Sequence, residues 1–185
     1  LIISALVLSV TSIYAASAAT TSNATAFKDV PTNHPFSASV AQLKAKGLVK
    51  GYGDGNFKPD NSVSRAEFIT MVMASIDKNN KGSNCFSDVK AEWFAPFICN
   101  AKAKGLVSGY ADKSFKPFNN INFAEASAII AKAHKLTPAA PKSGEAWFKP
   151  AVVKLETKAA IPTSIDYLDK KISRSETAEI IYRLT

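Results

Sequence analysis

Histidine is scarce in this sequence of 185 residues, which contains only His34 and His134. Neither stands at the spacing of a zinc site, and the signature motifs of serine hydrolases, zinc proteases and phosphate-binding loops are missing. We therefore expect no metal, no cofactor and no small-molecule substrate. A glycan-modifying enzyme with a carboxylate pair such as Asp54 and Asp60 is the least favoured alternative, because nothing builds a deep cleft around that pair.

Long apolar runs are missing as well, except in residues 1–26, which carry no charge and open with ten mostly apolar residues. Small residues follow at Ala16-Ser17-Ala18, as at the cleavage site of a secretory signal. We interpret the segment as an N-terminally incomplete signal peptide with a short spacer, which predicts an exported protein. An uncleaved membrane anchor is the alternative, since about 18 mostly apolar residues lie at the lower limit for a span.

Cysteine occurs only twice, as Cys85 and Cys99. In an exported protein an even pair predicts a disulfide. Such a bond closes a loop of about 15 residues and removes roughly 3 kcal/mol of unfolded-state entropy. Two buried thiols are the alternative, because the sequence does not show whether the two Cα atoms come close enough to be bridged.

Acidic residues are outnumbered, because 15 Asp and Glu face 23 Lys and Arg, which gives a net charge of +8. The excess is spread evenly along the chain, and no basic run with interleaved aromatics argues for nucleic acid. An exported protein of this charge is steered toward polyanions such as an acidic wall polymer, an anionic lipid or an acidic glycan. Charge alone does not choose among them.

Repetition is what the sequence has in abundance. Residues 44–67 return 58 positions later as residues 102–125, with 15 of the 24 positions identical. A weaker third copy, marked by Trp147-Phe148, ends the chain. A repeat of this length is one supersecondary unit that has to be buried against its siblings. We place the three copies at residues 27–81, 82–140 and 141–185.

Each copy is predicted to hold two helices joined by a loop. In the first copy, Pro35 suits the opening turn of a helix that ends near Gly47, and the glycine-rich segment 51–55 then forms a turn. Ser64-Arg-Ala-Glu67 is a capping box that starts the second helix. The corresponding starts are Asn122 to Glu125 and Ser173 to Glu176. The sequence thus predicts six helices and a mainly all-α fold.

The order of these signals is also that of a known motif. It runs Phe-x-Asp-Val, a helix, Gly-Leu-Val-x-Gly-Tyr-x-Asp-Gly-x-Phe-x-Pro, and then Val-Ser-Arg-Ala-Glu-Phe. This pattern resembles the S-layer homology (SLH) motif, strongly over residues 27–73, well over 86–131 and weakly over 147–183. The resemblance implies three tandem helix-loop-helix repeats, the third degenerate, packed as one pseudo-threefold helical domain. It also implies a non-catalytic anchor at the cell surface or cell wall of a bacterium.

The resemblance further implies a partner and a place for it. Proteins of this family bind an anionic, often pyruvylated, secondary cell wall polysaccharide or another peptidoglycan-associated polymer. Binding lies in grooves between neighbouring copies, where the Arg-containing start of one second helix meets the Gly-Leu-Val turn of another copy. Carried over by position, the ligand-binding residues are Arg65, Arg174, Ser64, Ser173, Tyr52, Gly47, Gly51, Gly105, Gly109 and Trp93.

The chemistry of these positions fits an acidic sugar. A guanidinium fork matches a carboxylate, and the free amides of a helix N-terminus favour the same anion. For Arg65, a surface ion pair with Glu67 or Asp60 is the alternative. Aromatic residues at four positions either stack on sugar rings or fill the core. They are Tyr52, Tyr110, Trp93 and Trp147, whereas Phe57, Phe94 and Phe115 are predicted to be packing residues.

The copies differ in ways that bear on function. Phe123 stands where the second copy should carry its Arg, and Lys113 replaces the glycine equivalent to Gly55. The third copy has only a short connection, residues 161–167, in place of the Gly-Tyr loop. One or two competent grooves are therefore expected rather than three. A self-associating structural protein that uses the apolar grooves between copies is the main alternative function.

Overall fold

The computed structural model describes residues 26–136 and 139–185. These residues form six α-helices joined by turns and isolated bridges, without a sheet. The predicted all-α fold and the number of helices are confirmed. The predicted signal peptide lies outside the described residues except for Ala26. The helices are α1 (Ser37–Ala45), α2 (Arg65–Ile76), α3 (Ala95–Ala103), α4 (Phe123–Ala133), α5 (Lys149–Thr157) and α6 (Arg174–Leu184).

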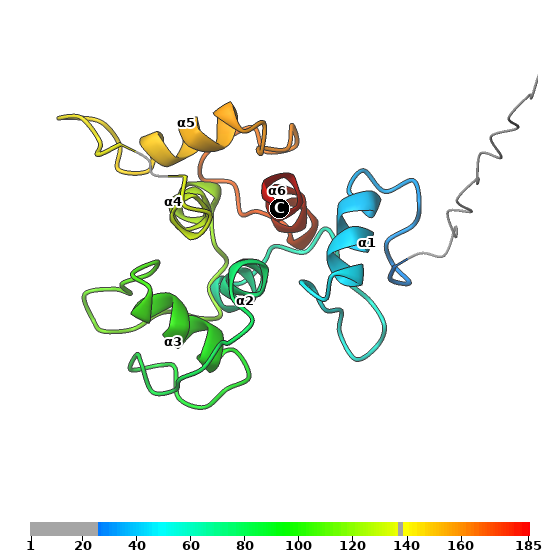
Figure 1. Cartoon of the computed structure of the whole chain (residues 1–185), viewed down its shortest axis with the longest axis horizontal. Helices are drawn as coiled ribbons and strands as arrows, with labels where there is room; N and C mark the ends of the chain where they lie inside the picture. Colours follow the sequence, from blue (N-terminus) through cyan, green and yellow to red (C-terminus); the bar gives the residue numbers. More distant parts are fainter. Residues whose placement is uncertain (1–25, 137–138) are drawn as a thin grey trace, which may run out of the picture.

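The second helix of each copy lies at the centre, and the first helix lies outside it (Figure 1). Each outer helix packs on the inner helix of the copy before it, α3 on α2 and α5 on α4. The pattern closes on itself because α1 packs on α6, so the first copy covers the third. At the centre α2 also packs against α4 and α6. The three copies therefore bury their apolar faces against one another in one body, as the tandem repeat predicts.

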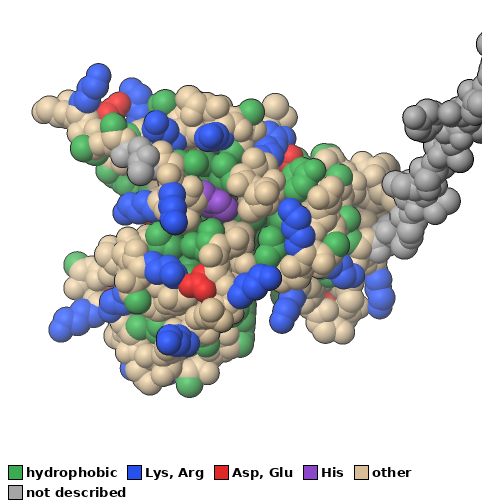
Figure 2. All heavy atoms as spheres, viewed as in Figure 1, with side chains coloured by type: hydrophobic (Ala, Val, Ile, Leu, Met, Phe, Trp, Pro, Cys, Tyr) green, Lys and Arg blue, Asp and Glu red, His purple; other side chains and the backbone are tan. Residues whose placement is uncertain are grey.

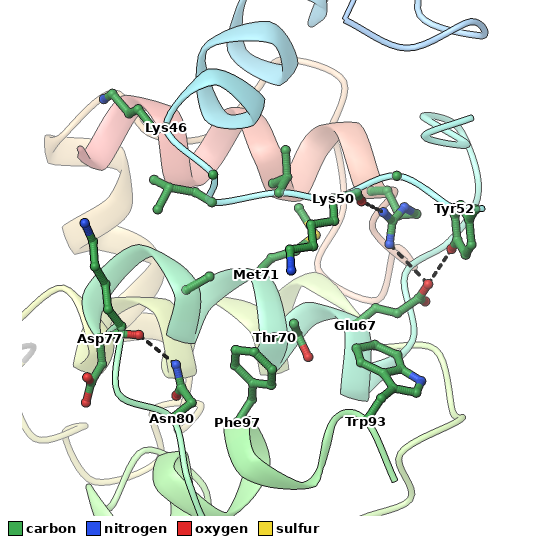
Figure 3. Close-up of a pocket in the computed structure, with 17 residues that line it drawn as sticks. Lys46, Lys50, Tyr52, Glu67, Thr70, Met71, Asp77, Asn80, Trp93 and Phe97 are labelled. Carbon is green, nitrogen blue, oxygen red and sulfur yellow. Dashed lines mark hydrogen bonds and ion pairs between the residues drawn. The ribbon is translucent and has the colours of Figure 1, made fainter. Parts of the chain in front are cut away.

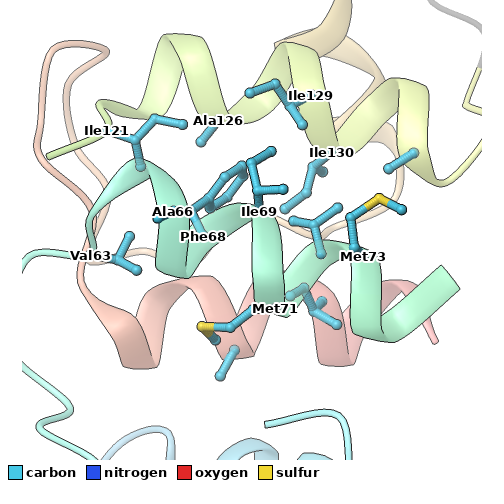
Figure 4. Packing of buried hydrophobic residues seen from close by; sticks show 14 of the residues in the cluster. Val63, Ala66, Phe68, Ile69, Met71, Met73, Ile121, Ala126, Ile129 and Ile130 are labelled. Carbon is cyan, nitrogen blue, oxygen red and sulfur yellow. The ribbon is translucent and has the colours of Figure 1, made fainter. Parts of the chain in front are cut away.

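Helix α2 supplies much of the central core (Figure 4). Phe68 and Ile69 are fully buried, and Ile69 faces Ile129 and Ile130 of α4. Met71 points the other way and is buried too, so α2 buries side chains on more than one face. Each such side chain contributes about 1.5–3 kcal/mol when it leaves water.

All three inner helices begin at a capping box. The Ser64 hydroxyl accepts a hydrogen bond from the Glu67 amide at 3.3 Å, and the Glu67 carboxylate accepts one from the Ser64 amide at 3.0 Å. Asn122 and Ser173 make the same reciprocal pairs in the other two copies. The predicted helix starts are therefore confirmed, including the one at Asn122.

A disulfide joins Cys85 to Cys99, whose Cα atoms lie 5.4 Å apart. The predicted bond is confirmed, and it ties the loop before α3 to that helix. The loop of the second copy also keeps its shape despite the lost glycine. Lys113 adopts a φ of 65°, close to the 84° of Gly55 in the first copy.

Basic side chains are scattered over all three lobes of the face that Figure 2 shows. Hydrophobic side chains gather in the hollows between the lobes. This agrees with a positive charge that is distributed evenly among the copies.

Candidate functional site: two grooves between the copies

Two grooves lie between the copies, and each receives residues from all three. The first has a volume of about 800 Å³ and is bounded by the Gly47–Tyr52 turn, α2, Trp93 from the second copy and Arg174 from the third. The second, of about 340 Å³, is bounded by the Gly105–Tyr110 turn, α4, Trp147 from the third copy and Arg65 from the first. The second groove therefore repeats the first, one step further round the ring. Eight of the ten predicted ligand-binding residues line one groove or the other, namely Arg65, Arg174, Tyr52, Gly47, Gly51, Gly105, Gly109 and Trp93.

The remaining two, Ser64 and Ser173, do not line either groove. Their hydroxyl groups accept the cap hydrogen bonds from Glu67 and Glu176. Their role in the described structure is to start α2 and α6, and nothing places them in contact with a ligand.

The turns that form one wall require glycine for steric reasons. A Cβ atom at Gly51 would lie 2.5 Å from the ring of Phe27 and 2.6 Å from the carbonyl oxygen of Asn56. Gly109 is enclosed in the same way in the second copy. The tight turn therefore depends on the absence of a side chain at this position.

We expect Gly51→Ala to lower the free energy of unfolding by about 1–3 kcal/mol, because the added methyl group meets backbone as well as a ring. Gly53→Ala, two residues away, is the matched control, since a Cβ there has nothing within 4 Å. Urea unfolding of both variants measures the difference. Equal stabilities for the two variants would show that the turn is free to relax.

Arg174 is held firmly at one end of the first groove. Its Nε donates to the Phe57 carbonyl at 2.8 Å, its Nη2 to the Lys50 carbonyl at 3.1 Å, and its Nη1 pairs with the Glu67 carboxylate at 3.1 Å. The guanidinium also lies over the ring of Tyr52, 4.8 Å from its centroid. Within the described structure, three of its five N–H donors are used in this way, and the other two make no hydrogen bond.

Arg65 occupies the equivalent place in the second groove. Its Nε donates to the Phe115 carbonyl at 3.0 Å, and its guanidinium lies 3.5 Å from Glu125 and over the ring of Tyr110. The side chain is buried. The predicted alternative, a surface ion pair with Glu67 or Asp60, is therefore wrong, because the partner is a carboxylate of the next copy.

The prediction of free amides at the helix starts is also wrong. The amide of Arg65 donates to the carbonyl of Asn119 at 2.8 Å, and that of Ala66 to Pro117 at 2.9 Å. Loops of the next copy thus satisfy the first two donors, and the capping residue takes the third. The other helix starts pair in the same way, Phe123 with Lys170, Ala124 with Leu168, Arg174 with Asn61 and Ser175 with Pro59. These amides join the copies to one another and do not receive an anion.

The carboxylate of Glu67 belongs to the groove as well as to the cap. Burial by itself raises its pKa, but hydrogen bonds from Tyr52 and Ser64 and the charge of Arg174 together hold the pKa below its usual value. Burial and the bond to Glu67 raise the pKa of Tyr52 to about 12. At neutral pH the phenol therefore donates to an ionised carboxylate, and the groove end is a fixed array of charge and polar groups.

From the sequence, Glu67 was predicted to serve the cap, and Glu125 was not predicted to be a site residue. The sequence did contain a pattern that could have predicted the role of these glutamates. A tyrosine precedes the glutamate by 15 positions in both copies, Tyr52 with Glu67 and Tyr110 with Glu125. Both pairs are hydrogen-bonded in the structure. Trp147 was named only as a stacking candidate, although its equivalence to Trp93 places it on the rim of the second groove.

The third junction, where α4 meets the loop of the third copy, is built differently. Phe123 replaces the arginine and is buried, and the cation comes instead from Lys170, whose Nζ lies 2.9 Å from the Glu176 carboxylate. Ser164 takes the place of the tyrosine and donates to Glu176 at 2.7 Å. The charge of the carboxylate is thus balanced without an arginine, as suits the predicted non-equivalence of the copies.

The three phenylalanines predicted to pack are buried, and the two tryptophans, for which stacking and core packing were both open, are exposed. Phe57 and Phe115 are completely buried and Phe94 nearly so. Trp93 and Trp147 are 63% and 60% exposed, although each contacts a neighbouring phenylalanine edge-on. An exposed indole on the rim of a groove is a surface on which a ring can stack.

The described residues contain no group of three or more side chains that could hold a metal ion. Their longest helix has 12 residues, and none is long and apolar enough to cross a bilayer.

Residues 26–69 and 86–127 each match a family model. That model is the S-layer homology domain. Each matched SLH segment contains one outer helix, one Gly-Leu-Val turn and the capping box of one inner helix. The third copy lies outside both segments, so its assignment as a degenerate SLH repeat stays a prediction that its two helices and its capping box support.

Proteins similar to this chain come from bacterial cell surfaces. Over 101 residues it is 42% identical to the Middle cell wall protein of Brevibacillus brevis, covering 51% of this chain and 10% of that protein. Over 110 residues it is 34% identical to the Cellulosome-anchoring protein of Acetivibrio thermocellus, with 56% and 25% covered. Over 171 residues it is 31% identical to an S-layer protein of Bacillus thuringiensis subsp. finitimus, with 84% and 21% covered.

The predicted location in the bacterial cell envelope is confirmed by these matches. The chain spans a quarter or less of the length of each of the three relatives. The relatives therefore bear on the SLH segments and not on the activity or partners of a whole protein.

Proposed function

We propose that this protein is a non-catalytic anchoring module that holds an anionic cell wall polysaccharide or peptidoglycan-associated polymer in the two grooves. The observation that carries the proposal is the composition of each groove. An arginine side chain from one copy, a Gly-Tyr turn from a second and an exposed tryptophan from a third converge on one cavity. The match to the SLH domain and the name of the Cellulosome-anchoring protein support an anchoring role.

The charge of the groove walls favours an anion. Four basic residues line the first groove against two acidic ones, and two line the second against one. The basic residues are Lys46, Lys50, Lys78 and Arg174 in the first groove and Arg65 and Lys132 in the second. A cleft lined mostly by one sign of charge concentrates ligands of the opposite sign. Pyruvylated sugars carry a carboxylate of this kind, so they are the ligands that we propose.

Exposed tryptophans make the function testable without disturbing the fold. We expect Trp93→Ala combined with Trp147→Ala to weaken binding to purified cell walls at least tenfold, since a stacked aromatic residue is a typical binding hot spot. Pelleting with walls of Brevibacillus brevis, Acetivibrio thermocellus and Bacillus thuringiensis measures the bound fraction. Binding should also fall as the salt concentration is raised, because salt screens exposed charges and the lysines that line the grooves are exposed.

A matched control is available in Tyr167, which is 60% exposed but lines neither groove. Tyr167→Ala should pellet like the unchanged protein. If the double tryptophan variant also pellets normally, the grooves are not the binding sites. If the unchanged protein pellets with none of the three walls but sediments as concentration-dependent oligomers alone, the self-associating alternative replaces the anchoring role.

A further inference from the structure

The two grooves share one half and differ in the other. The shared half holds the Gly-Tyr turn, the arginine, the glutamate and the tryptophan. Figure 3 shows that the first groove continues beyond them, with Asp77 and Asn80 at the end opposite Tyr52 and Trp93. We call this continuation the distal half, formed by Ala74, Asp77, Asn80 and Phe97.

The distal half is specific to the first groove. The residue equivalent to Ala74 is Lys132, whose long side chain lines the second groove. The residue equivalent to Phe97 is Ala151, which is buried in the third copy and offers no aromatic face. These replacements agree with the difference in volume, about 800 Å³ against about 340 Å³.

The length and volume of the first groove exceed the needs of one sugar ring. Glu67 lies in the first turn of α2 and Asp77 directly follows its last residue. The two are ten positions apart, which is about 15 Å at the rise of an α-helix. A volume of about 800 Å³ lies in the upper part of the range of small-molecule pockets, and about 340 Å³ lies at the bottom of it.

The polar groups of the distal half are fixed before any ligand arrives. Asn100 donates to Asp77 and to Asn80 at 3.1 Å each, and Lys104 pairs with Asp77 at 3.0 Å. Hydrogen bonds from the Asn79 amide, Lys104 and Asn100 lower the pKa of Asp77 to about 2, so it is ionised at neutral pH. A carboxylate can accept about four hydrogen bonds, and Asp77 already accepts from the Asn79 amide, Asn100 and Lys104, so about one site is left for a ligand. The Asn80 amide donates one N–H to the Asp77 carbonyl and keeps the other.

From this arrangement we infer that the first groove holds two consecutive sugars, an anionic one at Arg174 and a neutral pyranose in the distal half. The half-buried ring of Phe97 offers an apolar face, and Asp77 and Asn80 offer partners for hydroxyl or acetamido groups. A second carboxylate is disfavoured there because Asp77 lies in the wall. The second groove holds the anionic sugar alone. The inference rests on the proposed function, since both sugars belong to the same wall polymer.

Exchanging one residue between the grooves tests the inference. Ala74→Lys places the residue of the second groove in the first, and lysine is a good helix former, so the fold should persist. Titration with wall oligosaccharides of one and two residues, prepared from Brevibacillus brevis walls and read by calorimetry, measures each fragment. We expect the first groove of the unchanged protein to bind the two-residue fragment roughly tenfold more tightly than the one-residue fragment. The gain comes from one added hydrogen bond and one added ring contact.

In Ala74→Lys that tenfold gain should vanish, while binding of the one-residue fragment stays within twofold. The reciprocal variant Lys132→Ala removes a surface side chain but restores neither the ring of Phe97 nor the carboxylate of Asp77, so the second groove should still show no preference for the longer fragment. If Ala74→Lys keeps the full gain, or if Lys132→Ala gains a preference of the same size without the aromatic ring and the carboxylate, the distal half does not hold a sugar in the way inferred. If the unchanged protein binds no fragment at all, the proposed function fails first, and the two failures are thereby distinguished.

Discussion

Arg174→Ala should lower the free energy of unfolding by about 3–5 kcal/mol, because it removes one partner of a buried ion pair and leaves two carbonyl groups without a donor. The side chain is only 7% exposed and connects α6 of the third copy with the loop of the first. Glu67 loses its counter-charge, although Tyr52 and Ser64 still donate to it. Urea unfolding followed by circular dichroism measures the loss.

Two further variants show whether the effect comes from the buried pair. Arg174→Lys keeps the charge but not the planar fork that reaches three acceptors, so an intermediate loss is expected. Lys149→Ala breaks the exposed pair with Glu145 and should cost no more than about 1 kcal/mol. A loss for Arg174→Ala as small as that for Lys149→Ala would mean that the arginine does not hold the ring of copies together.

Replacing both cysteines, with Cys85→Ser and Cys99→Ser, should cost about 3 kcal/mol. The bond closes a loop with a sequence separation of 14, and the chain-entropy account gives this value for a loop of that length. The consequence should be local as well, because the disulfide ties α3 to the loop that carries Asn80, a residue of the distal half. Thermal unfolding and hydrogen exchange of α3 measure the two effects.

Reduction supplies the matched control for the cysteine variant. A reducing agent should shift the unchanged protein to the stability of the double serine variant and should leave that variant unaffected. If reduction leaves the unfolding transition of the unchanged protein where it was, the bond does not contribute to the folded state.

Much of the fold was open to prediction from local signals. The capping boxes at Ser64, Asn122 and Ser173 marked the inner helices, because cap and glutamate lie three positions apart and interact directly. The disulfide followed from the presence of two cysteines in an exported chain. The tandem repeat predicted that the copies pack on one another, although it did not show which outer helix covers which inner helix.

The environment of the arginines was not predictable in the same way. The carbonyl partner of Arg65 is 50 positions away, and that of Arg174 is 117 positions away, in copies that meet only in the folded ring. The same ring closure occupies the amides that the sequence left free. Phe123 stands where the other two copies carry an arginine. The structure explains this difference, because Lys170, far along the chain, supplies the missing cation.

The arginines thus have two roles in this interpretation: they stabilise the ring of copies, and they lie at one end of each groove. A binding test that removes them confuses the two, whereas the tryptophans on the rims separate them. The chain contains only two tryptophans, Trp93 and Trp147, and each lies on one groove. Every indole signal of the protein therefore reports on a groove.

The most direct measurement is an NMR titration of the two indole N–H signals with soluble polysaccharide released from bacterial cell walls. We predict that both signals shift and saturate with added polymer, while a neutral polymer of the same size shifts neither. Binding of the wall polymer that leaves both indole signals unmoved would contradict the proposal that the grooves are the anchoring sites.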